Sequence, residues 1–380
     1  MNKKIPIFLL VFVLFSSFVL GAAPSITDVI LNTSNGEFTL PNNLTVYEIN
    51  VTDADNDTVY TLYEWYKDTT LFSNFSKEVV IPQNYSQLYY DFEQNILDIG
   101  NGSDGAYACL SGTCTLNTDT NPDGWDFTTF SVSSGAQVVF TGSNEVELRV
   151  QGLFNISGLL NLTGQNGQDE VGAGAGGAGG VGRAGGYSGG AGDGEDGYNG
   201  TGPGYGERGV CDYGSAGGAG HANYGGNGTN GTYISQGGSP YGNLSSLLGG
   251  SGGGGGAGLC GTFTTGGDGG GAGGGAILIS AGQIIVNSGG EINTDGGCSG
   301  SDCAGNGGGG SGGTIKLRAT TITNNGALYS RGGNATGGDG SVGRITRFAS
   351  TYSGSGVRTP NWEIETGLSS NVEDQSNNQN

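Results

Sequence analysis

The sequence predicts an all-β protein: a short parallel β-solenoid with long glycine-rich insertions, preceded by a small β-sandwich-like module. Three observations support this. An aliphatic pattern recurs three times, 83 of the 380 residues are glycine and gather between the copies, and the first part has ordinary composition with short β-branched runs. The expected organisation is a signal peptide (1–22), a small module (23–95), first solenoid strands (96–163), a glycine-rich insertion (164–275), solenoid repeats (276–350) and a C-terminal tail (351–380).

The N-terminus has the layout of a secretory signal peptide. Lys3 and Lys4 precede an apolar run from Ile5 to Leu20, and small residues follow at 21–23. The run is short for a transmembrane helix, which needs about 20 residues, so we expect cleavage rather than a retained anchor. The mature protein is therefore predicted to be secreted or held at the extracellular cell surface, and not transmembrane.

Four short runs at 26–31, 44–51, 59–66 and 77–81 predict strands in the first module, because they are rich in β-branched and aromatic residues. The stretch from Val51 to Asp68, with its alternating aspartates and its Tyr-Glu-Trp-Tyr-Lys-Asp sequence, resembles immunoglobulin-like and cadherin-like modules of archaeal and bacterial surface proteins. The resemblance implies that Trp65 packs between two sheets.

Asp53, Asp55 and Asp57 are weak candidates for calcium ligands. They alternate, and Glu64 stands at the twelfth place of an EF-hand-like count, but the sixth place holds Thr58 where the loop needs glycine. An acidic turn between two strands is the alternative. The acidic stretch 193–197 is open to the same two interpretations.

The repeat is the main argument for a solenoid. Its copies span 146–164, 277–297 and 315–333, and in each one apolar residues alternate at i, i+2 and i+4 before a short turn and a second brief strand. Stacked copies would bury a continuous apolar row that no single copy can bury, although a two-sheet sandwich also uses alternating short strands.

Residues 98–367 also resemble the glycine-rich β-solenoid modules of archaeal and bacterial exported proteins. The likeness rests on Gly158-Leu-Leu-Asn-Leu-Thr-Gly164, on the poly-glycine loops, and on a closing strand that contains Gly343-Arg344-Ile345. It implies a cell-surface or adhesin-like role and no particular activity.

The glycine-rich stretches at 164–275, 296–313 and 332–343 allow two interpretations. Glycine-rich sequence is usually a flexible linker, but glycine also lets extended polyproline-II-like strands approach closely enough to bond to one another. In the second case the interleaved tyrosines would line the rim of the bundle: Tyr187, Tyr198, Tyr205, Tyr213, Tyr224 and Tyr233.

Six cysteines in an exported chain predict disulfides. Cys109 with Cys114 and Cys298 with Cys303 flank short turns that can close locally, and Cys211 would then pair with Cys260, although six cysteines allow about 15 pairings. A zinc site is disfavoured because the sequence has no C-x-x-C motif and only one histidine.

Asn-X-Ser/Thr motifs are dense and make the exported chain a candidate glycoprotein. The fourteen candidate sites are Asn32, Asn43, Asn50, Asn56, Asn74, Asn84, Asn101, Asn155, Asn161, Asn199, Asn227, Asn230, Asn243 and Asn334.

A net charge of −21 disfavours nucleic acid as a partner, and other surface proteins or glycans are expected instead. A polysaccharide-active solenoid enzyme is the main alternative, and it needs clustered charged residues on neighbouring rungs. Basic residues are few, Arg149 and Arg318 are expected to point into solvent, and Asp295 and Asp302 have no paired partner at fixed spacing. Serine-type catalysis would depend on His221 alone.

We therefore expect no catalytic residues and no cofactor. The first hypothesis is a structural or adhesive surface protein, and the second is a carbohydrate-binding or polysaccharide-degrading solenoid whose tyrosines stack on sugars. Ice or mineral binding by a flat polyglycine face is a third.

Overall fold

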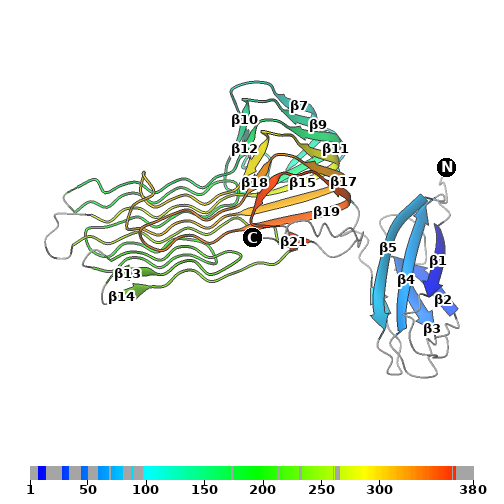
Figure 1. The fold of residues 1–380 in the computed structure, drawn as a ribbon, viewed down its shortest axis with the longest axis horizontal. Coiled ribbons are helices and arrows are strands. Elements are labelled where there is room, and N and C mark those ends of the chain that lie inside the picture. Colours follow the sequence, from blue (N-terminus) through cyan, green and yellow to red (C-terminus); the bar gives the residue numbers. More distant parts are fainter. Residues whose placement is uncertain are drawn as a thin grey trace. The chain divides into compact units, whose positions relative to one another are not determined.

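The computed structural model contains two compact units, residues 1–96 with 366–380, and residues 97–365. None of the described residues is helical, and the chain is all-β (Figure 1). The residues that the structure describes are 7–13, 28–33, 44–49, 59–67, 70–79 and 87–89 in the first unit, then 97–361 without 173, 212–213, 231–232, 260 and 262–265, and finally 363–364.

The first unit contains two three-stranded antiparallel sheets, with strand orders β1-β4-β5 and β2-β3-β6. The apolar N-terminal run, predicted to be removed as a signal peptide, forms β1 and pairs with β4 in this structure. The calcium candidates Asp53, Asp55 and Asp57 lie outside the described residues. The strands are β1 (Ile7–Val13), β2 (Asp28–Thr33), β3 (Leu44–Ile49), β4 (Val59–Lys67), β5 (Thr70–Val79) and β6 (Gln87–Tyr89).

The second unit contains two sheets in which every strand pair is parallel. One has the order β21-β19-β17-β15-β11-β9-β7 and the other β20-β18-β16-β12-β10-β8. Each strand of the first sheet except the last, β21, is followed in the chain by one of the second, so successive rungs of two strands stack. The strands are β7 (Gly105–Cys109), β8 (Thr113–Asn117), β9 (Trp125–Val132), β10 (Gln137–Thr141), β11 (Val146–Ile156), β12 (Leu159–Asn161), β15 (Ala276–Val286), β16 (Glu291–Asn293), β17 (Thr314–Asn324), β18 (Ala327–Tyr329), β19 (Arg344–Ser353), β20 (Val357–Thr359) and β21 (Glu363–Ile364).

The three predicted repeat copies are the rungs β11–β12, β15–β16 and β17–β18. The turn expected inside each copy does not break the strand, and each of β11, β15 and β17 continues for 11 residues. The rung β7–β8 had no sequence signal, and β20 and β21 lie within the range predicted as a tail.

Side chains from both sheets meet in a core of in-register ladders. One ladder runs Val146, Ile277, Ile315 and Ile345 across four strands, and all four side chains are fully buried. At the β7 end the rings of Tyr107 and Phe130 stack at 4.7 Å. Such stacking buries a continuous apolar row, worth about 25 cal/mol per Å² removed from water.

The β19–β20 rung replaces aliphatic residues by polar ones. Arg347, Tyr352 and Arg358 stand in register with Leu317, Ile322 and Leu328 of the preceding rung. The Arg347 guanidinium lies 3.9 Å from the centre of the Tyr352 ring, and Arg358 Nη1 donates to the Tyr352 hydroxyl at 2.5 Å. A polar terminal rung is what a stacked repeat needs to end its core.

The glycine-rich insertions form an array of extended segments joined by backbone hydrogen bonds, drawn in Figure 1 as the stack of thin lines beside the sheets. The bonds repeat every three residues. Gly250, Gly253 and Gly256 donate to the carbonyls of 274, 271 and 268, while Gly252 and Gly255 donate to those of 201 and 198. Each segment therefore points successive residues in three directions.

The central segment, 249–258, bonds to six neighbouring segments, which is the coordination of a hexagonal array. Those neighbours are 187–193, 198–201, 206–209, 214–217, 268–274 and 308–311. The same bond pattern arranges fourteen segments in four rows: 162–170, 294–300 and 330–335; then 175–184, 266–275, 305–313 and 337–343; then 186–194, 249–258, 214–221 and 223–230; then 197–203, 204–211 and 233–240.

The sequence of each segment matches its place in the array. All residues of 249–258 are buried, and eight of them are glycine. A Cβ on Gly253 would lie 2.2 Å from the carbonyl oxygen of Gly308, so only glycine fits there. In the outer segment 197–203, Gly197 and Gly200 face inwards, while residues 198, 199 and 201 carry exposed side chains. Interior segments are therefore almost pure in small residues, and outer ones are not.

We expect Gly253→Ala to destabilise the array by roughly 3 kcal/mol, because its Cβ overlaps a backbone carbonyl that cannot rotate away. Gln165→Ala, at an exposed outer position, is the control and should change the free energy of unfolding by less than about 0.5 kcal/mol. Guanidinium unfolding of the full chain, followed by circular dichroism, measures both. Equal effects of the two substitutions would contradict the close-contact model.

Candidate functional site

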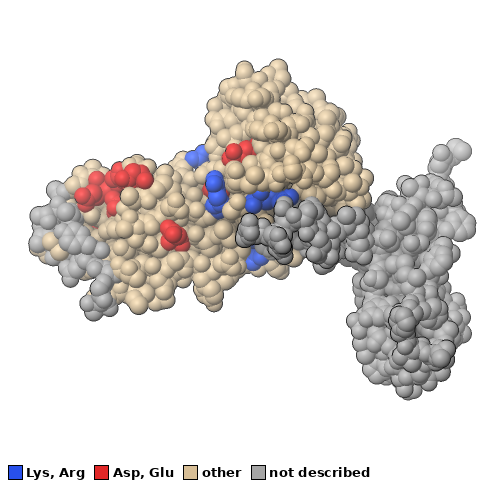
Figure 2. All heavy atoms as spheres, viewed as in Figure 1, with Lys and Arg blue, Asp and Glu red and all other residues tan. Residues whose placement is uncertain are grey.

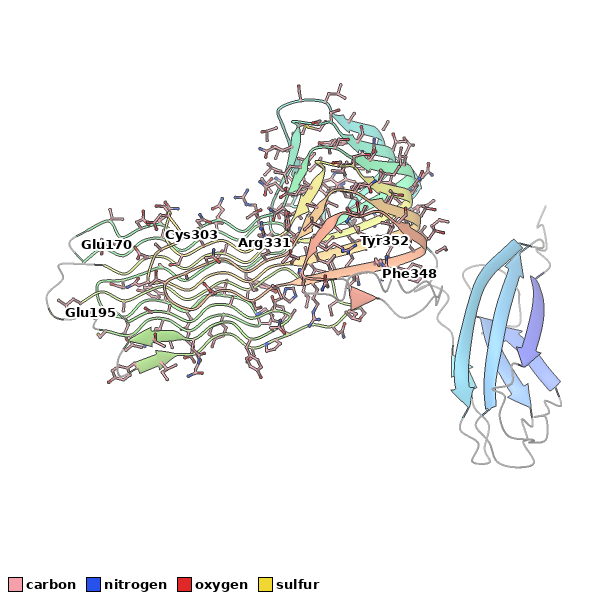
Figure 3. All side chains as sticks on the ribbon, viewed as in Figure 1. Glu170, Glu195, Cys303, Arg331, Phe348 and Tyr352 are labelled. Carbon is pink, nitrogen blue, oxygen red and sulfur yellow. A yellow bond between two sulfur atoms is a disulfide. The ribbon has the colours of Figure 1, made fainter. Side chains whose placement is uncertain are left out.

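The array presents two outer rows with different side chains, and these are the candidate functional surfaces of the second unit. We call the row of segments 162–170, 294–300 and 330–335 the polar face, and the row 197–203, 204–211 and 233–240 the tyrosine face. Glu170, Cys303 and Arg331 mark the side of the polar face in Figure 3, and β13 (Gly228–Asn230) and β14 (Tyr233–Ser235) lie on the opposite side.

The polar face carries amides and carboxylates and no aromatic residue. Gln165, Asn166, Gln168, Asp169 and Glu170 are all exposed on its first segment. Figure 2 shows Asp and Glu gathered towards the far end of the array, while Lys and Arg gather where the array meets the sheets. This separation of charge gives the far end a negative field.

The tyrosine face carries aromatic rings separated by polar side chains. Tyr198 and Tyr233 are 59% and 62% exposed, and Tyr205 lies on the segment between theirs. Arg208 occupies that middle segment too, where its backbone N–H donates to Asn199 Oδ1 at 2.9 Å and its carbonyl accepts from Ser235 Oγ at 2.8 Å. These bonds place the three segments in register across the face.

The predicted tyrosine rim is found for most of its members. Tyr198, Tyr205, Tyr224 and Tyr233 are among the most exposed large side chains of the described chain, and Tyr187 is half-buried. Tyr213 lies outside the described residues. Tyr241, which had no sequence signal, is instead partly buried, and its hydroxyl donates to the carbonyl of Gly249 at 2.6 Å.

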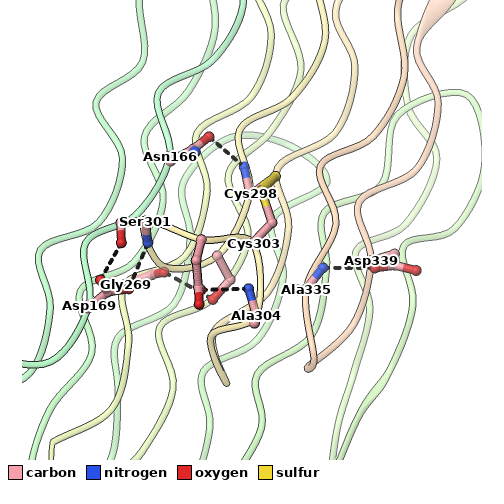
Figure 4. Close-up of a disulfide and its surroundings, with 11 residues drawn as sticks. Asn166, Asp169, Gly269, Cys298, Ser301, Cys303, Ala304, Ala335 and Asp339 are labelled. Carbon is pink, nitrogen blue, oxygen red and sulfur yellow. Dashed lines mark hydrogen bonds between the residues drawn. A yellow bond between two sulfur atoms is a disulfide. The ribbon is translucent and has the colours of Figure 1, made fainter.

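Two of the three predicted disulfides are present. Cys109–Cys114 joins β7 to β8, and Cys298–Cys303 closes the turn at the far end of the polar face (Figure 4). Asn166 Oδ1 accepts from the Cys298 N–H at 3.0 Å, and Asp169 accepts from the Ser301 N–H at 2.7 Å. Cys211 is also disulfide-bonded, and Cys260, the partner that the sequence predicts, lies outside the described residues.

Carboxylates at the far end bind the N–H groups of its turns. Asp169 accepts from both the hydroxyl and the N–H of Ser301, and these two bonds lower the pKa of its carboxyl group. Glu170 Oε2 accepts from Gly266 N, and Asp268 accepts from Glu170 N and Asn306 N. The acidic residues thus satisfy donors that the array leaves open where its segments reverse.

Two expectations for charged side chains are wrong. Asp295 is 8% exposed and is paired, because its carboxylate accepts from the backbone N–H, Nε and Nη2 of Arg331 on the adjacent segment. Arg149 does not extend freely into solvent, since Nε lies 2.5 Å from Asp126 and Nη1 lies 3.1 Å from Glu147. Asp295 and Arg331 are 36 residues apart, Arg149 and Asp126 are 23 apart, and Arg149 and Glu147 are two apart, so no fixed spacing identifies these pairs. Asp302 is exposed and accepts from Ala304 N, as a turn residue does.

The described residues contain no group of three His, Cys, Asp or Glu side chains that could hold a metal ion. In the acidic stretch 193–197, Asp193 bonds to Gly194 N, and Asp196 bonds to Cys211 N and pairs with Arg208 at 3.2 Å. These contacts agree with the interpretation of the stretch as an acidic turn.

His221 is buried within the array rather than placed in a cleft. Its Nδ1 lies 2.6 Å from the carbonyl oxygen of Gly312, and because a carbonyl only accepts, the proton is on Nδ1. The ring stacks on Tyr241 at 4.7 Å. Burial lowers the pKa of His221 to about 4, with a smaller contribution from the nearby charge of Arg344. A neutral imidazole that is 1% exposed and bonded to the backbone has a structural role in the array.

Five of the seven sequon asparagines whose exposure the structure describes lie on the surface. Asn101, Asn199, Asn227, Asn243 and Asn334 are exposed, and Asn155 and Asn161 are partly buried. Asn32, Asn74 and Asn230 lie in β2, β5 and β13, while Asn43, Asn50, Asn56 and Asn84 lie outside the described residues.

No helix in the described part of the chain has the length and apolar character needed to cross a membrane. No family model, curated protein or solved structure matches the sequence. The two faces, the disulfides and the array are therefore the features of the molecule that bear on its function.

We expect the stability of the protein to fall by about 3 kcal/mol as pH decreases from 6.5 to 4, through His221 alone. The unfolded histidine takes up a proton near pH 6.5, whereas the folded one does so only near pH 4, so the unfolded state binds more protons throughout that window. Thermal or denaturant unfolding across this pH range measures the slope. His221→Gln is the comparison, because it keeps every carboxylate contribution and removes only the histidine's. Identical slopes for the two proteins would refute this role.

Proposed function

We propose that the protein is an exported, glycosylated, non-catalytic surface protein with a structural or adhesive role, in which a short parallel β-solenoid holds out a rigid polyglycine array. The observation that carries this proposal is the array itself. Its interior segments use their backbones to bond to one another and have hardly any side chains to offer to a substrate. Side chains are displayed only at the perimeter of the array, as on a platform for contact with other surfaces.

The solenoid and polyproline-II assignments have separate support. Two all-parallel sheets with in-register ladders and a polar end rung are what stacked solenoid rungs would produce. Backbone bonds that recur every three residues match the three-residue turn of polyproline II, which has no internal hydrogen bonds and must find partners in its neighbours.

Export is supported by the sequence layout of residues 1–23 and by the disulfides, since disulfides persist in oxidising compartments. Cleavage there would remove β1 and leave β4 paired with β5 alone in its sheet. An adhesive role would place other surface proteins or glycans as partners of the outer rows.

Antibody labelling of intact cells, with mass spectrometry of protein released from their surface, tests the proposal. We expect surface labelling, a mature N-terminus near Pro24 and sugar on several sequons. A panel of polysaccharides incubated with the purified chain should release no new reducing ends. Turnover of one of them, lost on substitution of a single carboxylate, would contradict the non-catalytic role.

We expect Leu10→Arg to keep the chain inside the cell, because a charge at the centre of the apolar run costs roughly 2.5–3.5 kcal/mol on membrane insertion. Fractionation and immunoblotting measure the exported share. Leu10→Ile is the control and should be exported like the natural chain. Normal export of the arginine variant would show that residues 5–20 do not direct secretion.

A further inference from the structure

Several exposed tyrosines of the array stand next to sequon asparagines. Tyr198 directly precedes Asn199, and Tyr224 stands three residues before Asn227. Tyr233 is the register partner of Asn230 in the β13–β14 hairpin. Each of these tyrosines is about 60% exposed or more, so most of each ring is accessible to a ligand.

The side chain of Asn199 is held by the neighbouring segment. Its Oδ1 accepts from the backbone N–H of Arg208 at 2.9 Å, and the residue remains exposed. Because an amide places oxygen and nitrogen on opposite sides of its carbon, fixing Oδ1 turns Nδ2 away from the Arg208 N–H. Nδ2 is the atom to which an N-linked glycan is joined. Tyr198, 59% exposed, is the residue directly before this oriented attachment point on the same segment.

Asn227 repeats this arrangement by a different route. Its Oδ1 accepts from the backbone N–H of Gly237 at 2.8 Å. Gly225 and Gly228 pair with residues 238 and 235 of the neighbouring segment 233–240. The contacts of segment 223–230 therefore also repeat every three residues. Tyr224 and Asn227 therefore point in the same direction from the segment, one turn apart. Tyr224 is 73% exposed, the highest value among the tyrosines whose exposure the structure describes.

We propose that Tyr198 and Tyr224 are platforms on which the first sugars of N-linked glycans at Asn199 and Asn227 lie. The proposal rests on the glycosylation included in the proposed function. A tyrosine ring has an apolar face and a polar tip, and so suits a sugar, which has an apolar C–H face and hydroxyl edges. The occupant is the chain's own glycan, because each attachment nitrogen belongs to an exposed asparagine with a fixed Oδ1, within three residues of an exposed ring.

The attachment itself is a substitution at the anomeric carbon of a sugar donor activated as a phosphate ester. Nδ2 forms the bond to that carbon, the phosphate-linked carrier leaves with the bonding electron pair, and one amide proton is released. The Thr201 and Thr229 hydroxyls complete the two sequons. The array contributes rigidity, so little side-chain or loop freedom is lost when the sugar settles on the ring.

Asn334 provides an internal control. It is an exposed sequon asparagine on the polar face, and the segments around it, 294–300, 305–313 and 337–343, contain no aromatic residue. A glycan at Asn334 should therefore extend into solvent without a platform.

Proton NMR of the full chain, secreted by a eukaryotic host, tests the contact directly. Peptide mass spectrometry first establishes which sequons carry sugar. Ring protons of the first sugar at Asn199 and Asn227 should be shifted upfield by the aromatic rings, relative to those at Asn334. Tyr198→Ala should abolish the shift at Asn199 alone, Tyr224→Ala that at Asn227 alone, and Tyr198→Phe should retain it.

A thermal measurement gives a second, independent readout. In the glycosylated chain Tyr198→Ala should lower Tm by roughly 2–4 °C more than it does in the same chain from a host without N-glycosylation. Sugar present at both sites without upfield shifts would overturn this inference and leave the proposed function standing. Absence of sugar at Asn199 and Asn227 would overturn the inference, and absence at every sequon would also remove glycosylation from the proposed function.

Discussion

The second unit depends on one constraint, the approach of backbones so close that no Cβ fits between them. At Gly253 the nearest carbonyl oxygen lies 2.2 Å from where a Cβ would stand, and a segment with six neighbours meets this contact in every direction. Glycine pays a large ordering entropy. Here that cost is offset because most N–H and C=O groups of the interior segments find partners in adjacent segments, as buried backbone groups require.

The two parts of this unit solve the problem of a buried interior in opposite ways. The sheets enclose apolar ladders and stop them with the Arg347, Tyr352 and Arg358 rung. The array has almost no apolar interior, so its stability depends on hydrogen bonds rather than on hydrophobic burial. Its outer side chains therefore do not have to pack into a core. This freedom is why the rows can differ, one polar and one carrying tyrosines, without altering the array beneath them.

Much of the sheet architecture could be predicted from local pattern. The alternating aliphatics at 146–150, 277–281 and 315–319 identified three rungs because each inward residue repeats with the period of a strand. The rung β7–β8 was not predicted, because its short strands contain few aliphatic residues. The close cysteine pairs were predictable from their turns. The Asp295–Arg331 pair was not, since 36 residues separate its members and only the stacking of segments brings them together.

Whether the glycine-rich stretches are ordered could not be predicted from the sequence. Glycine content alone suits a disordered linker as well as an ordered bundle. The distinguishing signal lies in the contrast between pure glycine runs such as 252–256 and segments such as Gly197-Tyr-Asn-Gly200, where glycine returns at the third position. The first kind belongs in the interior and the second at the surface. The pairing of Tyr198 with Asn199 Oδ1 and the Arg208 N–H needs the register of three segments, which no local pattern contains.

The connectivity of the array has a consequence for how such a protein could change in length. Its fourteen segments arise from three excursions of the chain, containing ten, two and two segments, and every excursion leaves the sheets and returns to them. An excursion that ends where it began must contain an even number of passes. Insertions and deletions are therefore tolerated as whole outward-and-return hairpins of about twenty residues, which add or remove two positions at the perimeter. Because each excursion keeps an even number of segments, such changes leave the register of the rungs unaltered while the displayed surface varies.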